Sequence, residues 1–173
     1  MKKDRKSNRN IHLYGEINDD TIQKIVYNID TLYEEDPIKN INMYISSGGG
    51  RVSASFAFYD YIKSMSKIKL HTFALGGVNS MAIIIFLAGI KRAAGPNASF
   101  FFHELGRTFK ETSLSCSDLK VHSNELITSQ EKYIDIVKEN TNLEIDTITD
   151  ILKNETTVEP EEALEMGILH KIL

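Results

Sequence analysis

Residues 68–89 have the sequence IKLHTFALGGVNSMAIIIFLAG, in which two apolar runs are separated by a pair of glycines. The first run, 68–75, is short and bounded by Gly76, which predicts a strand. The second run, Met81 to Gly89, is far shorter than the roughly 20 residues of a membrane helix, and it predicts a buried helix that starts near Ser80. A strand that turns directly into a helix is the repeating unit of a parallel α/β sheet.

The same alternation continues on both sides of this stretch. Short apolar runs predict strands, and apolar residues spaced three and four apart predict helices. The predicted strands are 11–14, 41–46, 68–75, 91–94, 99–103 and 169–173, and the predicted helices are about 22–33, 52–66, 80–89, 117–140 and 145–152. We therefore expect an α/β fold with a mainly parallel sheet covered by helices, whose functional groups gather where strands end.

Length and composition place the chain among ordinary globular proteins. Its 173 residues fit one domain, and a net charge of −4 gives no sign of a nucleic-acid partner. We expect a single domain over 11–173, preceded by a disordered basic tail over 1–10. Neither a signal peptide nor a membrane segment is expected, and the single cysteine fits the cytoplasm. The five histidines have no cysteine or carboxylate at ligand spacing, so we expect no metal and no cofactor.

Ser80 is the first candidate for chemistry, because it stands between a strand with its glycine pair and the start of a helix. A serine at such a sharp turn projects its hydroxyl. The free N–H groups at the helix N-terminus would suit a developing oxyanion. The ordinary alternative is a serine that only caps the helix.

Two further segments stand at the ends of predicted strands. Gly48–Gly50 would let backbone amides approach a ligand closely, and a plain strand-to-helix turn is the alternative. His103 closes the apolar strand 99–103, where it could take a proton from a neighbouring group. A lone histidine is more often structural, and each of these signals is weak alone. The order of these segments along the chain is stronger evidence of function than any one of them.

In that order, the segments resemble the proteolytic subunit of the Clp protease, within the Clp/crotonase superfamily. The resemblance covers about Arg9 to Leu173. It rests on the motifs IHLYGEI (11–17), MYISSGGG (43–50), GGVNSM (76–81), PNAS (96–99), FH (102–103) and EALEMGI (162–168). It implies a Clp/crotonase-like βαβ superhelical fold with a protruding strand–helix handle at about 104–140.

The resemblance also implies a serine endopeptidase. Ser80 would attack the peptide carbonyl, and His103 would act as its general base. The orienting aspartate of the family falls on Glu155, with Asn154 as the adjacent candidate. The alternative for Glu155 is an exposed acidic residue in a loop.

The family's oxyanion hole falls on the backbone N–H groups of Gly50 and Met81. Such donors matter as much as side chains, because losing one typically costs about 10²–10³ in rate. Asn79 departs from the family pattern, since it stands where the family has alanine, and Gly48 stands where the family has proline.

The resemblance further implies a homo-oligomer, a heptameric ring or double ring, that cuts unfolded polypeptides or phage structural proteins in its chamber. The chain begins close to its first strand, without the family's axial loop and first helix, which argues against an AAA+ unfoldase as partner. Trimmed relatives of this kind resemble phage or prophage enzymes. The alternatives are a catalytically silent assembly subunit and, ranked lower, an acyl-CoA enzyme of the crotonase type.

Overall fold

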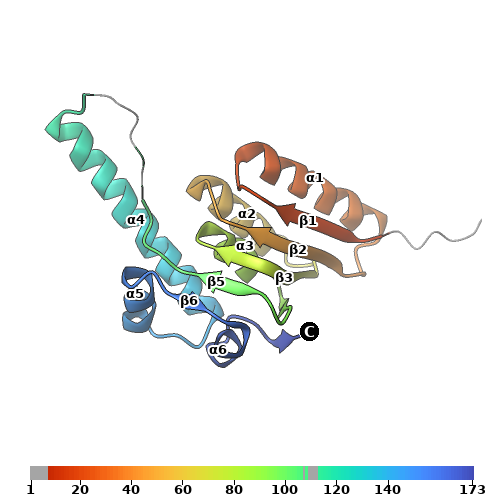
Figure 1. The fold of residues 1–173 in the computed structure, drawn as a ribbon. Coiled ribbons are helices and arrows are strands. Elements are labelled where there is room, and N and C mark those ends of the chain that lie inside the picture. The colour runs from red at the N-terminus through yellow and green to blue at the C-terminus, as the bar shows by residue number, and fades with distance from the viewer. Residues whose placement is uncertain (1–7, 107, 109–112) are drawn as a thin grey trace, which may run out of the picture.

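Strands and helices alternate along the chain in the computed structural model, which describes residues 8–106, 108 and 113–173. In chain order the elements are β1 (Asn10–Tyr14), α1 (Asp19–Glu35), β2 (Ile41–Ser47), α2 (Val52–Ser64), β3 (Leu70–Asn79), α3 (Met81–Leu87), β4 (Lys91–Ala94), β5 (Ser99–Phe101), α4 (Cys116–Asn140), α5 (Ile145–Lys153), β6 (Thr157–Val158), α6 (Pro160–Glu165) and β7 (Lys171–Ile172). Figure 1 shows their arrangement.

The strands form one mainly parallel sheet in the order β1-β2-β3-β4-β7. β5 also pairs with β3 in parallel, and the short strand β6 pairs with β5 in the antiparallel direction. The mainly parallel α/β fold expected from the alternation is confirmed. Strand β6 is a pairing that the sequence did not predict, because two residues are too few to give a periodic signal.

β3 is longer than predicted and changes partner along its length. Its first half pairs with β4, from His71 opposite Lys91, and its last residues pair with β5, up to Asn79 opposite Phe101. The register against β2 shifts between the two halves. The glycine pair predicted as a turn therefore lies inside the strand. Gly76 has φ +113°, which favours glycine and fits such a bulge.

Burial alternates along the central strands, so the sheet has one buried face. Every second residue of β2, from Ile41 to Ser47, is buried, and the residues between them are half-buried. α1 packs against β1 and β2, and α3 packs against β2 and β3. All seven residues of α3 are buried, as the apolar run predicted. This central position fixes the N-terminus of α3 firmly in the core.

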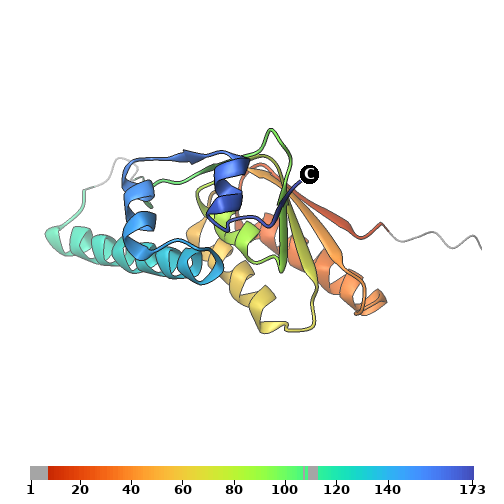
Figure 2. The ribbon, with the colours of Figure 1, turned by 90° about the horizontal axis from the view of Figure 1, so that it is seen from below.

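α4 projects away from the sheet, as the expected handle would (Figure 1). Its C-terminal half is anchored by Tyr133 and Val137, which are buried, whereas Leu119 and Ile127 are about half exposed. The apolar face predicted along this helix is therefore covered only near its end. α5 lies between α4 and the short strand β6 (Figure 2). Residues 107 and 109–112 of the expected handle lie outside the described residues.

The folded chain starts earlier than residue 11. Arg9 is buried and its guanidinium donates to the backbone carbonyls of Asp36 and Asn40, at 3.0 and 3.1 Å. Asn10 is the first residue of β1. Both residues were placed in the predicted tail, of which residues 1–7 lie outside the described part of the chain. Within the described ranges, no helix has the length and apolar character needed to cross a membrane.

Candidate active site

Ser80 sits in a strained turn between β3 and α3. Its backbone has φ 53° and ψ −128°, a conformation that costs a non-glycine residue of order 1–3 kcal/mol and that often marks functional sites. The Ser80 N–H donates to the Phe101 carbonyl at 2.8 Å, which fixes the turn against β5. The side chain makes no capping bond to α3. Ser80 therefore occupies the N-cap position of α3 without the side-chain hydrogen bond by which a serine usually caps a helix.

The glycine turn after β2 packs directly on this serine. A Cβ added to Gly49 would lie 2.8 Å from the Cβ of Ser80, 2.9 Å from the carbonyl oxygen of Asn79 and 3.2 Å from the Met81 nitrogen. Side-chain carbons essentially never approach other atoms within 3.0 Å, as the first two of these contacts would require. The glycine at 49 is thus required by the contact between the two turns, which a plain strand-to-helix connection would not need.

Two backbone amides beside Ser80 remain without an acceptor among the described residues. The Gly49 N–H donates to the Ser47 hydroxyl at 3.1 Å, and the Arg51 N–H donates to the Ile17 carbonyl at 2.8 Å. The Gly50 N–H, which lies between them, donates in none of these hydrogen bonds. Met81 is the first residue of α3, and the amide at that position has no partner within its own helix.

His103 lies two residues past the point where β5 pairs with the end of β3. Its ring stacks on Phe101 with centroids 5.5 Å apart. Its Nδ1 lies 2.7 Å from the Glu104 carbonyl oxygen. A carbonyl only accepts, so Nδ1 carries the hydrogen, and Nε2 of the neutral ring keeps a free lone pair. In the described part of the chain, no hydrogen bond joins this ring to the Ser80 hydroxyl.

The pairing of β5 with β6 brings Glu155 to the neighbourhood of His103. Phe101 stands opposite Thr157, and the Phe102 N–H donates to the Thr156 carbonyl at 2.9 Å. The strand pairing ends there, because Glu155 has φ 49° and belongs to the turn after α5, where its N–H donates to the Leu152 carbonyl at 3.3 Å. Glu155 is thus next in the chain to the residue that holds Phe102, but no strand register sets it opposite His103.

The Glu155 carboxylate itself is exposed and makes no hydrogen bond or ion pair within the described ranges. Asn154, the other candidate, ends α5 and is exposed as well. Only Ser80 and Glu155 have positive φ among the described non-glycine residues.

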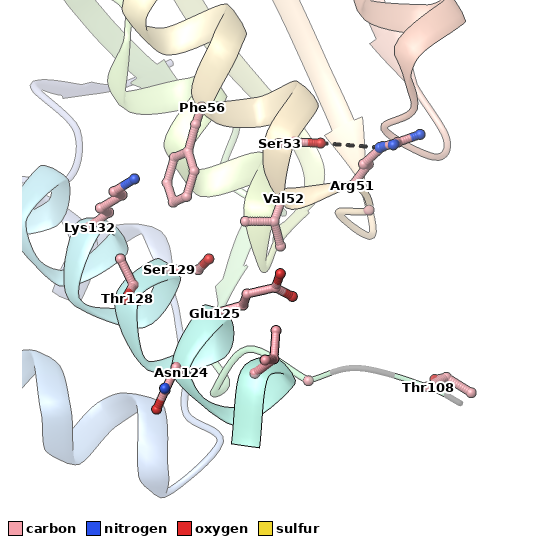
Figure 3. Close-up of a pocket in the computed structure, with 13 residues that line it drawn as sticks. Arg51, Val52, Ser53, Phe56, Thr108, Asn124, Glu125, Thr128, Ser129 and Lys132 are labelled. Atoms are coloured by element: carbon pink, nitrogen blue, oxygen red, sulfur yellow. Dashed lines mark hydrogen bonds between the residues drawn. The ribbon is translucent and has the colours of Figure 1, made fainter. Parts of the chain in front are cut away.

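A cleft of about 940 Å³ begins at the glycine turn (Figure 3). Gly50, Val52 and Phe56 line it from the turn and α2, and Thr128 and Lys132 line it from α4. This cleft could not be predicted from the sequence, because its two walls are about 70 residues apart in the chain and meet only through the packing of α4. The site therefore has a buried serine and two free amides, and the cleft reaches it at Gly50, whereas Ser80, Met81 and His103 do not line the cleft.

Comparison with known proteins gives the family. A model of the family described as Clp protease matches residues 3–173. The chain belongs to the Clp protease family. It is also similar to the ATP-dependent Clp protease proteolytic subunit of Bdellovibrio bacteriovorus, with 29% identity over 159 residues, which cover 91% of this chain and 74% of that relative. The expected family membership is thus confirmed, and the chain is a Clp-type peptidase.

Within this Clp-type peptidase, Asn79 is a residue whose importance the sequence did not show. Its Oδ1 is buried and has no donor among the described residues. The amide packs on Gly77, where an added Cβ would lie 3.2 Å from Nδ2. Sequence comparison with the family pattern marked Asn79 only as a replacement for alanine. An unsatisfied oxygen directly before Ser80 costs folding energy that alanine would not.

Proposed function

We propose that this Clp-type peptidase is a serine endopeptidase with Ser80 as nucleophile and His103 as general base. The observation that carries the proposal is the Ser80 turn, which is strained, 8% exposed and packed against Gly49. A turn that serves only to connect β3 to α3 has no need of this strain. Ser80 also stands at the start of the buried helix α3, where the Met81 amide has no partner within the helix, and this supports its assignment as nucleophile.

The reaction would proceed through an acyl-enzyme. The Ser80 Oγ attacks the carbonyl carbon of the scissile bond, while its proton passes to Nε2 of His103. The amides of Gly50 and Met81 donate to the oxyanion of the tetrahedral intermediate. His103 then gives the proton to the leaving amine, which leaves an ester between Ser80 and the acyl part of the substrate. A water molecule attacks this ester while His103 takes its proton, and His103 returns the proton to the Ser80 Oγ as the carboxylic acid product is released.

The tautomer of His103 supports this role. With Nδ1–H bonded to the Glu104 carbonyl, the free lone pair lies on Nε2, the nitrogen that must accept the proton. The ring has to approach Ser80 when substrate binds, as catalytic hydrogen bonds in free enzymes are often long or absent. Glu155 is the chain neighbour of Thr156, whose carbonyl binds the Phe102 N–H. In the substrate-bound state its carboxylate would accept the hydrogen bond from Nδ1 and stabilise the imidazolium.

The exposed apolar residues of α4 that lie outside the cleft support self-association. Leu119 and Ile127 are each more than half exposed on the projecting helix. We propose that they are covered by another copy of the chain in a ring or double ring, heptameric as in the resemblance, with the serines inside. Substrates would then be unfolded polypeptides or phage structural proteins that enter the chamber. The relative from Bdellovibrio is named as an ATP-dependent subunit. That name favours an ATPase partner for this chain, which the departures from the family pattern had made doubtful.

Peptidase assays combined with native mass measurements test the proposal. We expect cleavage of an unstructured fluorogenic peptide by the assembled wild type and none above background by Ser80→Ala or His103→Ala at unchanged oligomeric mass. Glu155→Ala should lose about 10-fold or more, since the ring would be less well oriented. Wild-type protein that assembles but never cleaves would show a catalytically silent subunit, in keeping with the exposed Glu155 carboxylate. Full activity in Glu155→Ala would refute only the assignment of Glu155 as the residue that orients His103, and would leave the roles of Ser80 and His103 in place.

A further inference from the structure

The cleft beside Gly50 has walls of different chemistry. Val52 and Phe56 present apolar side chains from α2, whereas Thr128 and Ser129 present hydroxyls from α4 (Figure 3). Lys132 follows them on the same face of α4, one turn further along, and its side chain lies beside the ring of Phe56. An occupant of this end of the cleft would therefore meet an apolar wall, two hydroxyls and one ammonium.

Lys132 differs from the other charged residues of the cleft. Arg51 is bound to Asp19 at 2.6 Å, and Glu125 lies 3.4 Å from His122. No ion pair of 4 Å or less involves Lys132 in the ranges that the structure describes. A second hollow on its other side is lined by Asp60, Asp135 and Glu139, yet none of these carboxylates reaches its ammonium.

We propose that Lys132 makes the cleft select an acidic side chain on the substrate residue that supplies the scissile carbonyl. The inference rests on the proposed function, because it takes the Gly50 amide as a donor to that carbonyl oxygen. Gly50 lines the cleft, so a side chain next to a carbonyl held by the Gly50 amide would enter it. A glutamate would lay its methylenes on Val52 and Phe56. Its carboxylate would accept from the Lys132 ammonium and from a hydroxyl of Thr128 or Ser129.

A pair of peptides that differ only by glutamate or glutamine at this position tests the charge without changing the size. For the wild type, kcat/KM should favour the glutamate peptide by about 1.5-fold to fivefold at low salt, the range of a solvent-accessible ion pair. The preference should shrink as salt screens the pair.

Lys132→Met keeps the stem and should bring the ratio close to one, and Lys132→Glu should favour a lysine peptide. Lys120→Met is the matched control, because Lys120 is also exposed on α4 but does not line this cleft. It should keep the wild-type ratio.

The outcomes separate this inference from the proposed function. Cleavage of both peptides with equal or reversed preference by the wild type would overturn the selectivity and leave the peptidase intact. An unchanged ratio in Lys132→Met would assign the preference to another residue and would also overturn it. Absence of cleavage of either peptide, together with an unreactive Ser80, would instead remove the proposed function on which the selectivity rests.

Discussion

Replacing Gly49 with alanine tests how tightly the two turns of the site are packed. The added methyl would lie 2.8 Å from the Ser80 Cβ, about 0.7 Å inside the ~3.5 Å at which carbon atoms attract each other. Gly49 also has φ +97°, which costs an alanine of order 1–3 kcal/mol. Overpacking adds about 1–3 kcal/mol. We therefore expect Gly49→Ala to lower the free energy of unfolding by about 2–6 kcal/mol.

The activity should fall further than the stability explains. Relieving this overlap of about 0.7 Å displaces Ser80 from its position against the glycine turn. Because a misplacement of about 1 Å costs about 100-fold in rate, we expect a loss of about 10-fold to 100-fold. The measurement is kcat/KM per folded protein, with urea unfolding monitored in parallel.

Gly48→Ala is the matched control in the same turn, because nothing lies within 4 Å of its added Cβ. Its unfolding midpoint and kcat/KM should stay near those of the wild type. Wild-type activity in Gly49→Ala, or an equal loss in Gly48→Ala, would refute the close packing of the two turns.

Three further substitutions probe other parts of the chain. Asn79→Ala should raise the free energy of unfolding by about 1 kcal/mol, because a buried oxygen without a donor costs about 1–3 kcal/mol; a lower urea midpoint would show that Asn79 is paired. Arg92→Met should lower the free energy of unfolding by about 3 kcal/mol, since three backbone carbonyls lose their donor. The control Arg51→Met, at an exposed arginine, should change the free energy of unfolding little. Equal effects of the two substitutions would contradict the burial of Arg92. Burial and the nearby Arg92 lower the pKa of His170, whose Nδ1 accepts from the Arg92 N–H. The folded state therefore binds fewer protons, and stability is complete above about pH 6.5 and falls as the pH drops below that value. His170→Asn should flatten this acid limb in thermal melts, and an unchanged limb would exclude the residue as its source.

Patterns within short windows of sequence predicted much of this fold. The apolar run after Ser80 predicted the buried helix α3, and the alternation of runs predicted the parallel sheet. The order of the glycine turn, Ser80 and His103 gave the family. Each of these signals lies within a few residues of the chain, which is why a single sequence carries them.

Features that depend on contacts between distant parts of the chain could not be predicted from the sequence. β3 runs through Gly76 and Gly77 because two partners, β4 and β5, bind successive parts of it. The position of Glu155 depends on the two-residue strand β6, whose partner lies more than 50 residues earlier. The exposure of Leu119 reflects the projection of α4, which apolar spacing does not predict. Local pattern gives the candidates, and only the packing of the chain sets their neighbours.

Mapping a fluorophosphonate adduct on the assembled protein tests the central claim most directly. The account predicts one adduct on the tryptic peptide that contains Ser80, and labelling at least 100-fold slower in His103→Gln, because the general base that activates the hydroxyl is missing. A folded, assembled wild type that takes up no probe at Ser80, or that labels equally fast without His103, would contradict the account.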